Sequence, residues 1–139
     1  MNRCASAVRL RAPALACALA VLAAGLVPLH AAAQVHRNFP QNALRGTVAF
    51  GQPPEAVLNG DATRLAPGAR IHGPDNMIVM SGTLMGQKYT VNYTTEPGGM
   101  LFEIWILRAE EAAVRPWPQT PQQATTWSFD PIAQIWTPN

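Results

Sequence analysis

The chain is poor in charged residues and in cysteine, and each shortage excludes a class of protein. Charged residues are 13% of its 139 residues, about half of the usual share. The two cysteines, Cys4 and Cys17, both precede residue 34. Beyond that point the chain therefore has no thiol for a disulfide, a cysteine-ligated zinc site or a cysteine nucleophile.

Basic residues are also scarce beyond residue 33. That part of the chain has seven basic and eight acidic residues, a net charge of −1 before the termini are counted. Lys88 is its only lysine. Proteins that bind nucleic acid or anionic membranes present a basic surface. We therefore expect no nucleic-acid partner.

The first 33 residues have the three parts of an export signal. The positive start contains Arg3, Arg9 and Arg11. The uncharged apolar run that follows is Ala12–Leu29, and the small-residue motif is Ala31–Ala33. We predict cleavage between Ala33 and Gln34 and a periplasmic or secreted product. Pro13 and Pro28 interrupt the apolar run, which favours cleavage over a membrane anchor. The later apolar run Leu101–Leu107 is too short to span a bilayer, so we expect no stable membrane span after cleavage. Whether an uncleaved signal acts as an anchor is not predicted.

Turn and strand patterns divide the remaining chain into three parts. Residues 34–43 lack periodicity and are expected to form a flexible lead. Residues 44–107 contain short apolar runs between turns and are expected to form a β-barrel domain. Residues 108–139 are expected to form a tail that packs on the barrel.

Two hairpins have the clearest signals. Asn59-Gly60 lies between two short strand patterns and predicts a tight turn, and Ala66-Pro67-Gly68 predicts a further turn before a separate strand at residues 70–72. In Gln87–Leu107, two alternating patterns flank Pro97-Gly98, which suits the centre of a type II turn with Gly98 at the positive-φ position. The returning strand, Met100–Leu107, is apolar on both faces and should be covered on both sides.

The tail contains three of the four tryptophans. Residues 108–114 are expected to form a helical turn or two. Thr120-Pro121-Gln122-Gln123 has a capping threonine, proline at the first helical position and a glutamine that completes a capping box. We expect the tryptophan-rich tail to cover Trp105.

These elements predict an all-β fold, a small antiparallel barrel or strongly curved sheet of five to six strands, with a short helical, tryptophan-rich tail. Three segments, Arg64–Ile71, Tyr89–Thr94 and Glu103–Leu107, resemble small exported bacterial β-barrel proteins of OB-like layout and unassigned function. The resemblance implies a fold and a compartment, and no activity.

Catalytic groups are few. His72, Asp75 and Ser81 are close in sequence, outside any nucleophile elbow. Glu103 is the one charged side chain on an apolar strand, and a half-buried carboxylate can act as an acid. The preferred interpretation is an ion pair with Arg70 or Arg64. A small hydrolase that uses Glu103 or His72 is kept as an alternative, and we expect no enzyme.

Two copper hypotheses remain open. A new N-terminus at Gln34, with His36 in third place, offers nitrogen ligands for Cu(II). His72 with Met77, Met80 and Met85 offers soft ligands for Cu(I), although methionines at such positions are usually core residues. The preferred expectation is no metal and no cofactor.

A non-enzymatic binding module, or an accessory protein of the cell envelope, is the preferred function. The candidate surface residues are Trp117, which lies between two prolines, Tyr89 and Tyr93, since aromatic residues dominate interface energetics. The alternative for Trp117 is packing on its own barrel. The ligand, the envelope partner and the oligomeric state are not predicted.

Overall fold

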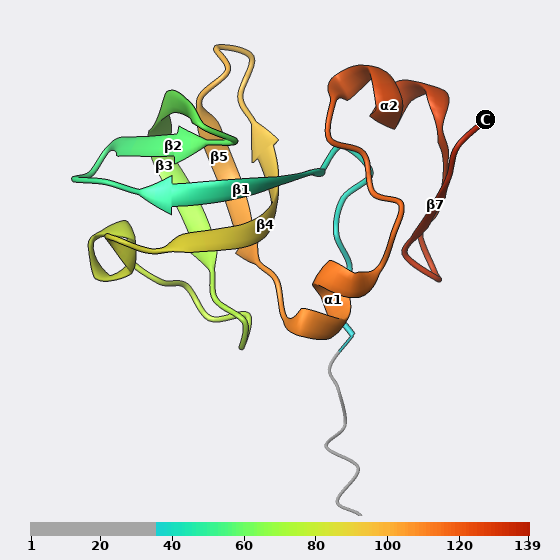
Figure 1. Cartoon of the computed structure of the whole chain (residues 1–139), viewed down its shortest axis with the longest axis horizontal. Helices are drawn as coiled ribbons and strands as arrows, with labels where there is room; N and C mark the ends of the chain where they lie inside the picture. The colour runs from blue at the N-terminus through green and yellow to red at the C-terminus, as the bar shows by residue number, and fades with distance from the viewer. Residues whose placement is uncertain (1–35) are drawn as a thin grey trace, which may run out of the picture. The chain divides into compact units, whose positions relative to one another are not determined.

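The computed structural model describes residues 36–139, so the predicted signal, its cleavage position, both cysteines and Gln34 lie outside the described residues. In chain order the elements are β1 (Leu44–Phe50), β2 (Glu55–Leu58), β3 (Asp61–His72), the 3₁₀ turn η1 (Ser81–Leu84), β4 (Lys88–Thr95), β5 (Leu101–Ile106), α1 (Ala109–Ala113), α2 (Pro121–Thr126), β6 (Ser128–Asp130) and β7 (Ile135–Thr137) (Figure 1). No helix within residues 36–139 is both long and apolar enough to cross a membrane.

Five strands form a closed barrel in the order β1-β2-β3-β5-β4, and β6 and β7 form a separate two-stranded sheet. The barrel closes because β4 pairs with β1 as well as with β5. Most pairs are antiparallel, but β3 and β5 are parallel. The predicted all-β class with two short helices is confirmed, and the barrel has the lower of the two expected strand numbers.

The hairpin between β2 and β3 has the predicted turn. Leu58 faces Asp61, and both intervening residues have positive φ, 52° at Asn59 and 95° at Gly60. Two consecutive positive φ angles define the type I′ turn, whose twist matches that of the strands. The side chain of Asn59 also accepts a hydrogen bond from the Thr47 amide at 2.8 Å, which ties the turn to β1.

The turn between β4 and β5 differs from the prediction by one position. Positive φ occurs at Gly99, with φ of 85°, and not at Gly98. The Gly99 amide donates to the Glu96 carbonyl at 2.9 Å, and the Glu96 amide donates to the Met100 carbonyl at 3.0 Å. A four-residue turn whose last residue is a left-handed glycine makes these bonds, so Gly99 has the positive φ that was expected at Gly98.

β3 is one long strand, and the separate strands predicted on either side of residues 66–68 are wrong. The strand continues through Pro67 and Gly68, while its register against β5 shifts between Leu65 and Arg70. Proline and glycine are tolerated within a strand at such bulges. The sequence marks this bulge with the residues of a turn.

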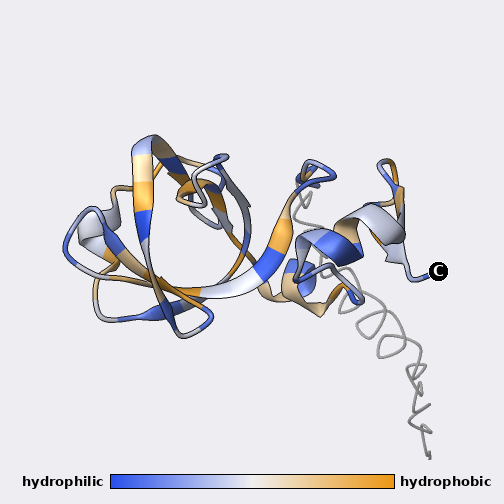
Figure 2. Ribbon diagram, turned by 90° about the horizontal axis from the view of Figure 1, so that it is seen from above, coloured by the Kyte–Doolittle hydropathy of each residue, from blue (hydrophilic) through white to orange (hydrophobic). Residues whose placement is uncertain are grey.

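The barrel interior is filled by alternate side chains of the strands, and Val48, Val91 and Ile104 are completely buried. Figure 2 shows hydrophobic and hydrophilic positions following one another along these strands. A register shift between β4 and β5 breaks the alternation expected for the last strand: Leu101 is buried in the barrel core and Phe102 is 39% exposed. On the outer face of β5, Trp105 packs against the tail.

The tail packs on β5 as predicted. A second apolar cluster joins Trp105 and Leu107 to residues on both sides of the barrel sequence, Phe39, Ala43, Trp117 and Trp136. α2 begins as expected, because the Thr120 side chain accepts from the Gln123 amide. The tail thus forms the cover that the apolar outer face of β5 requires.

The segment expected to be a flexible lead is held in place from residue 37 onward. Arg37 and Phe39 are each 6% exposed, and Ala43 is fully buried. The Phe39 amide donates to the side chain of Gln134 at 2.8 Å. The sequence prediction failed because the segment has no periodicity of its own, and its buried side chains are spaced to fit the tail.

Candidate functional site

The sequence-predicted acid, Glu103, lies in an ion-pair cluster on the outside of the barrel. Its carboxylate is 3.1 Å from His72 Nε2 and 3.4 Å from the Arg70 guanidinium, and the His72 ring stacks on Trp105 at 5.5 Å. The predicted pairing with Arg70 is confirmed, while Arg64 pairs with Glu55 instead. This arrangement holds β3 beside β5.

Asp75 and Ser81, the two residues close to His72 in sequence that would complete a Ser-His-Asp triad with it, have local roles. The Asp75 carboxylate accepts a hydrogen bond from the Met77 amide at 3.1 Å, and Ser81 begins η1. The His72 nitrogen that would serve as a base faces Glu103. The structure therefore gives His72 an acidic partner other than Asp75.

The methionines proposed as copper ligands are not core residues, contrary to the preferred interpretation. Met77, Met80 and Met85 are 67%, 78% and 49% exposed. Within residues 36–139, no three His, Cys, Asp or Glu side chains are grouped to hold a metal ion. His36 is exposed.

Two of the three candidate surface aromatics are buried, which corrects their expected role. Trp117 is 5% exposed and donates its indole N–H to the Ala43 carbonyl at 3.0 Å. Tyr93 is 5% exposed in the barrel core, where burial raises its pKa. Tyr89 is half-buried beside Phe50. Trp117 follows the alternative that it packs on its own barrel.

A groove that the sequence analysis did not find lies between the outer face of β1 and the tail. Its main cavity has a volume of about 790 Å³. Strands β1 and β4, the β2–β3 turn and residues 112–127 contribute its lining, which comprises Arg45, Gly46, Thr47, Asn59, Thr90, Ala112, Arg115, Pro116, Trp117, Gln119, Gln123 and Trp127. We call this the basic groove.

The floor of the basic groove follows from strand alternation. Thr47 faces Thr90 across β1 and β4, and both are exposed while their neighbours Val48 and Val91 point into the barrel core. Successive side chains of a strand point to opposite faces. The barrel core therefore fixes which side chains reach the groove.

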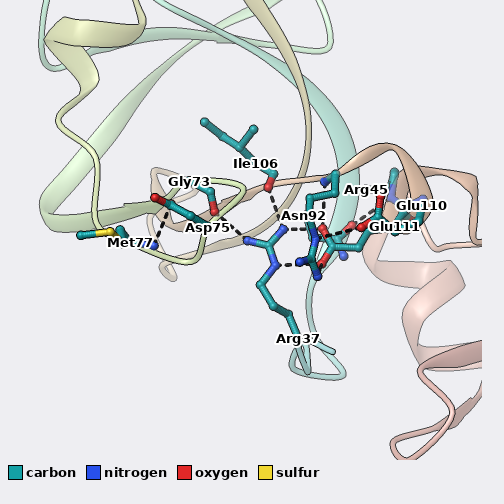
Figure 3. Close-up of polar contacts among 10 residues, drawn as sticks. Arg37, Arg45, Gly73, Asp75, Met77, Asn92, Ile106, Glu110 and Glu111 are labelled. Atoms are coloured by element: carbon teal, nitrogen blue, oxygen red, sulfur yellow. Dashed lines mark hydrogen bonds and ion pairs between the residues drawn. The ribbon is translucent and has the colours of Figure 1, made fainter. Parts of the chain in front are cut away.

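Arg45 is the buried cation of the groove. It is 8% exposed, its Nε donates to the Asn92 side chain at 2.9 Å, and its terminal nitrogens donate to the carbonyls of Glu111, Ala112 and Val114. Its guanidinium also lies 4.9 Å from the centre of the Trp117 ring. Figure 3 shows Arg45 beside Asn92 and Glu111. These bonds fix the path of α1 along the groove.

Glu111 forms the second layer behind Arg45. It accepts hydrogen bonds from the Arg37 side chain and from both the backbone and the side chain of Arg108, and Arg37 also donates to the carbonyls of Gly73 and Ile106 at 2.8 Å each (Figure 3). Burial alone would raise the pKa of Glu111, but the hydrogen bonds from Arg37 and Arg108, with the charge of Arg37, bring that pKa below its ordinary value. Glu111 is thus the charged anchor between lead, barrel and α1.

The open part of the groove carries excess positive charge. Burial and the neighbouring charge of Arg115 lower the pKa of Arg45 to about 10, against a smaller opposing effect of Glu111. Arg115 is exposed and makes no ion pair with any residue in 36–139. No carboxylate lines the groove. An anion placed beside these two guanidinium groups would relieve their repulsion.

The polar walls of the groove offer mainly hydrogen-bond donors. The Asn59 side-chain oxygen accepts from the Thr47 amide, and the Gln123 side-chain oxygen accepts from the amides of Gln119 and Thr120. With those oxygens occupied by backbone, the amino groups of Asn59 and Gln123 are left to donate. Together with the guanidinium groups, they suit a ligand rich in acceptor oxygens.

The groove continues past Asn59 into a second cavity of about 670 Å³. The two cavities share Thr47, Asn59 and Gln119 in their linings. Lys88 lines the far part, which also has no carboxylate. The whole groove is therefore elongated and carries a basic residue at each end.

The sequence holds little signal for this groove, because its residues come from four separated parts of the chain. The motifs among them, the turn at Asn59 and the capping box at Gln123, indicate local structure and no ligand. The only hint is the scarcity of basic residues, which makes three of them on one face noteworthy. Comparison with known proteins gives no identification: no protein-family model, no curated protein and no solved structure matches the chain.

Proposed function

We propose that this protein is a non-enzymatic binding module of the cell envelope whose basic groove holds an anionic ligand. The observation that carries the proposal is the pair Arg45 and Arg115, which face one groove without a carboxylate in its lining. Holding the charge of Arg115 beside the buried charge of Arg45 costs free energy. A bound carboxylate or phosphate would offset this cost by forming charge-assisted hydrogen bonds.

The two arginines have different roles in binding the anion. Arg45 donates to Asn92 and to the carbonyls of Glu111, Ala112 and Val114 at the end of α1, so its guanidinium is held in place and supplies fixed positive potential. Arg115 is exposed and free of ion pairs with the described residues, so its planar guanidinium can form bidentate bonds to a carboxylate or phosphate. Trp127, half-buried in the lining, offers an apolar wall beside the anion.

The test is an NMR titration of the ¹⁵N-labelled protein with succinate and with inorganic phosphate. We expect saturable shifts of the Gly46 amide and the Trp127 indole N–H, and a roughly tenfold or greater loss of affinity in Arg115→Ala, because hydrogen bonds to charged groups are stronger than neutral ones. Arg64→Ala is the matched control, since Arg64 is an exposed arginine in a surface ion pair with Glu55. Equal affinity of both variants would refute the proposal.

Export is a separate part of the proposal. The tripartite pattern of residues 1–33 supports it, and the resemblance to exported OB-like barrels remains a prediction. Intact-mass analysis of protein recovered from the periplasm tests it: the expected species begins at Gln34, and a species that begins at Met1 in the cytosol would refute export.

A further inference from the structure

The two basic ends of the groove are four strand positions apart. Arg45 faces Asn92 and Ala49 faces Lys88 in the register of β1 and β4. Arg115 lies at the Arg45 end, because the neighbouring carbonyl of Val114 accepts from Arg45 at 3.0 Å. Four residues of strand span roughly 13 Å. At this backbone spacing, two carboxylates suit the two basic ends better than one does.

We propose that the basic groove binds an extended acidic peptide in which carboxylate side chains at positions i and i+4 meet Arg115 and Lys88. This inference rests on the proposed anion-binding function and adds the ligand class. An extended chain rises about 3.3 Å per residue, and side chains at i and i+4 lie on the same face. The spacing of the two side chains along the peptide then matches the four-residue backbone offset between the Arg45 end and Lys88.

The middle of the groove suits a peptide backbone. Thr47 and Thr90 are small and exposed on its floor, so a chain can approach closely between the two ends. The amino groups of Asn59 and Gln123 can donate to peptide carbonyls. β1 is already paired with both β2 and β4, so the peptide is held through side chains and does not add a strand to the sheet.

The same groove is a poor match for nucleic acid. Single-stranded nucleic acid is held by several stacking aromatics along a basic track. The groove lining contains two tryptophans, and Trp117 is only 5% exposed. One accessible ring, Trp127, is left for stacking. An acidic glycan carries similar carboxylates and is therefore the competing ligand that the experiment includes.

The experiment measures fluorescence anisotropy of dye-labelled hexapeptides with blocked ends and a serine and alanine background. One peptide has glutamates at i and i+4, one at i and i+2, one has a single glutamate, and one has glutamine at both positions. We expect the i, i+4 peptide to bind roughly two- to fivefold more tightly than the single-glutamate peptide, as for one partly exposed ion pair. The i, i+2 peptide should show no such gain.

Lys88→Ala isolates the second contact. It should abolish the gain from the second glutamate, measured as the ratio of the affinities of the i, i+4 and the single-glutamate peptides, whereas Arg64→Ala should leave that ratio unchanged. Arg115→Ala should weaken both acidic peptides. A gain that is equal at i+2, or that persists in Lys88→Ala, overturns the proposal.

Two further outcomes separate this inference from the function on which it rests. If the single-glutamate peptide binds through Arg115 and the second glutamate adds nothing, the peptide inference fails and anion binding stands. If no acidic peptide, succinate or phosphate binds in an Arg115-dependent way, both fail. Tighter binding of oligogalacturonate than of the i, i+4 peptide overturns the peptide in favour of a glycan.

Discussion

Replacing Glu111 with glutamine should destabilise the protein strongly, although the two side chains have nearly the same shape. The Glu111 side chain is 11% exposed and that of Arg37 is 4% exposed. The carboxylate accepts from Arg37 Nε at 2.8 Å, from the Arg108 amide at 2.8 Å and from an Arg108 terminal nitrogen at 2.9 Å. Glutamine removes the charge and one acceptor from this cluster of donors.

The magnitude follows from leaving Arg37 buried without its counter-charge. Removing one partner of a buried ion pair costs about 3–5 kcal/mol. The amide of Glu111→Gln keeps one oxygen for hydrogen bonding, so we expect a loss near the lower end, about 3 kcal/mol. For a domain of this size that lowers the melting temperature by roughly 12–24 °C.

The pH dependence gives a second, independent signature. Because the folded-state pKa of Glu111 lies below its ordinary value, the carboxylate contributes stability that is present above the unfolded-state pKa and is lost as the pH falls through the folded-state pKa. Wild type and Glu111→Gln should therefore differ at neutral pH and converge as the pH falls through the folded-state pKa of Glu111.

Urea denaturation, followed by circular dichroism at neutral and at acidic pH, measures these differences in the free energy of unfolding. Glu110→Gln is the control, because Glu110 is 45% exposed and pairs with Arg108 at 3.2 Å. It should cost less than about 1 kcal/mol. A Glu111→Gln protein as stable as the control, or a difference from wild type that does not shrink in acid, would refute the reasoning.

Two further predictions concern the tail and the first hairpin. Trp136→Ala should cost about 3–5 kcal/mol, because Trp136 is 1% exposed in the second apolar cluster; thermal unfolding measures it, and a change below about 1 kcal/mol would show that the tail contributes little. Gly60→Ala should cost about 1–2 kcal/mol, because φ at Gly60 is 95° while a Cβ there would meet no atom within 4 Å. Denaturant unfolding checks it, and an unchanged midpoint would show that the turn relaxes at no cost.

The sequence predicts those elements whose signals are local. The Asn59-Gly60 turn and the capping box that starts at Thr120 each need only a few adjacent residues, and both are confirmed. The ion pair of Glu103 with Arg70 was also predictable, since a single charged residue on an apolar strand needs a partner nearby. These features depend on conformational preferences that do not require the rest of the fold.

Features that depend on distant residues were not predictable. Pro67 and Gly68 indicate a turn locally, but the pairing of β3 with both β2 and β5 carries the strand through them. Residues 36–43 have no pattern because their partners, such as Gln134 for Phe39, lie in the tail. Trp117 looked like a surface anchor for the same reason: its covering residues come from both ends of the described chain.

The groove is the extreme case of this limit. Arg45 is an ordinary strand residue in the sequence, and Arg115 has no motif around it. Only the closure of the barrel and the path of residues 112–127 bring them to one cavity. Basic residues from separate segments can be recognised as a site only after the topology is known.

Because of where the tryptophans lie, their fluorescence reports on the interface between barrel and tail. Three of the four belong to the second apolar cluster, and Trp127 packs against it, whereas the barrel interior contains none. Intrinsic emission therefore reports undocking of the C-terminal segment, while far-ultraviolet dichroism follows the strands. Superimposable melts by the two methods would mean that barrel and tail unfold as one cooperative unit.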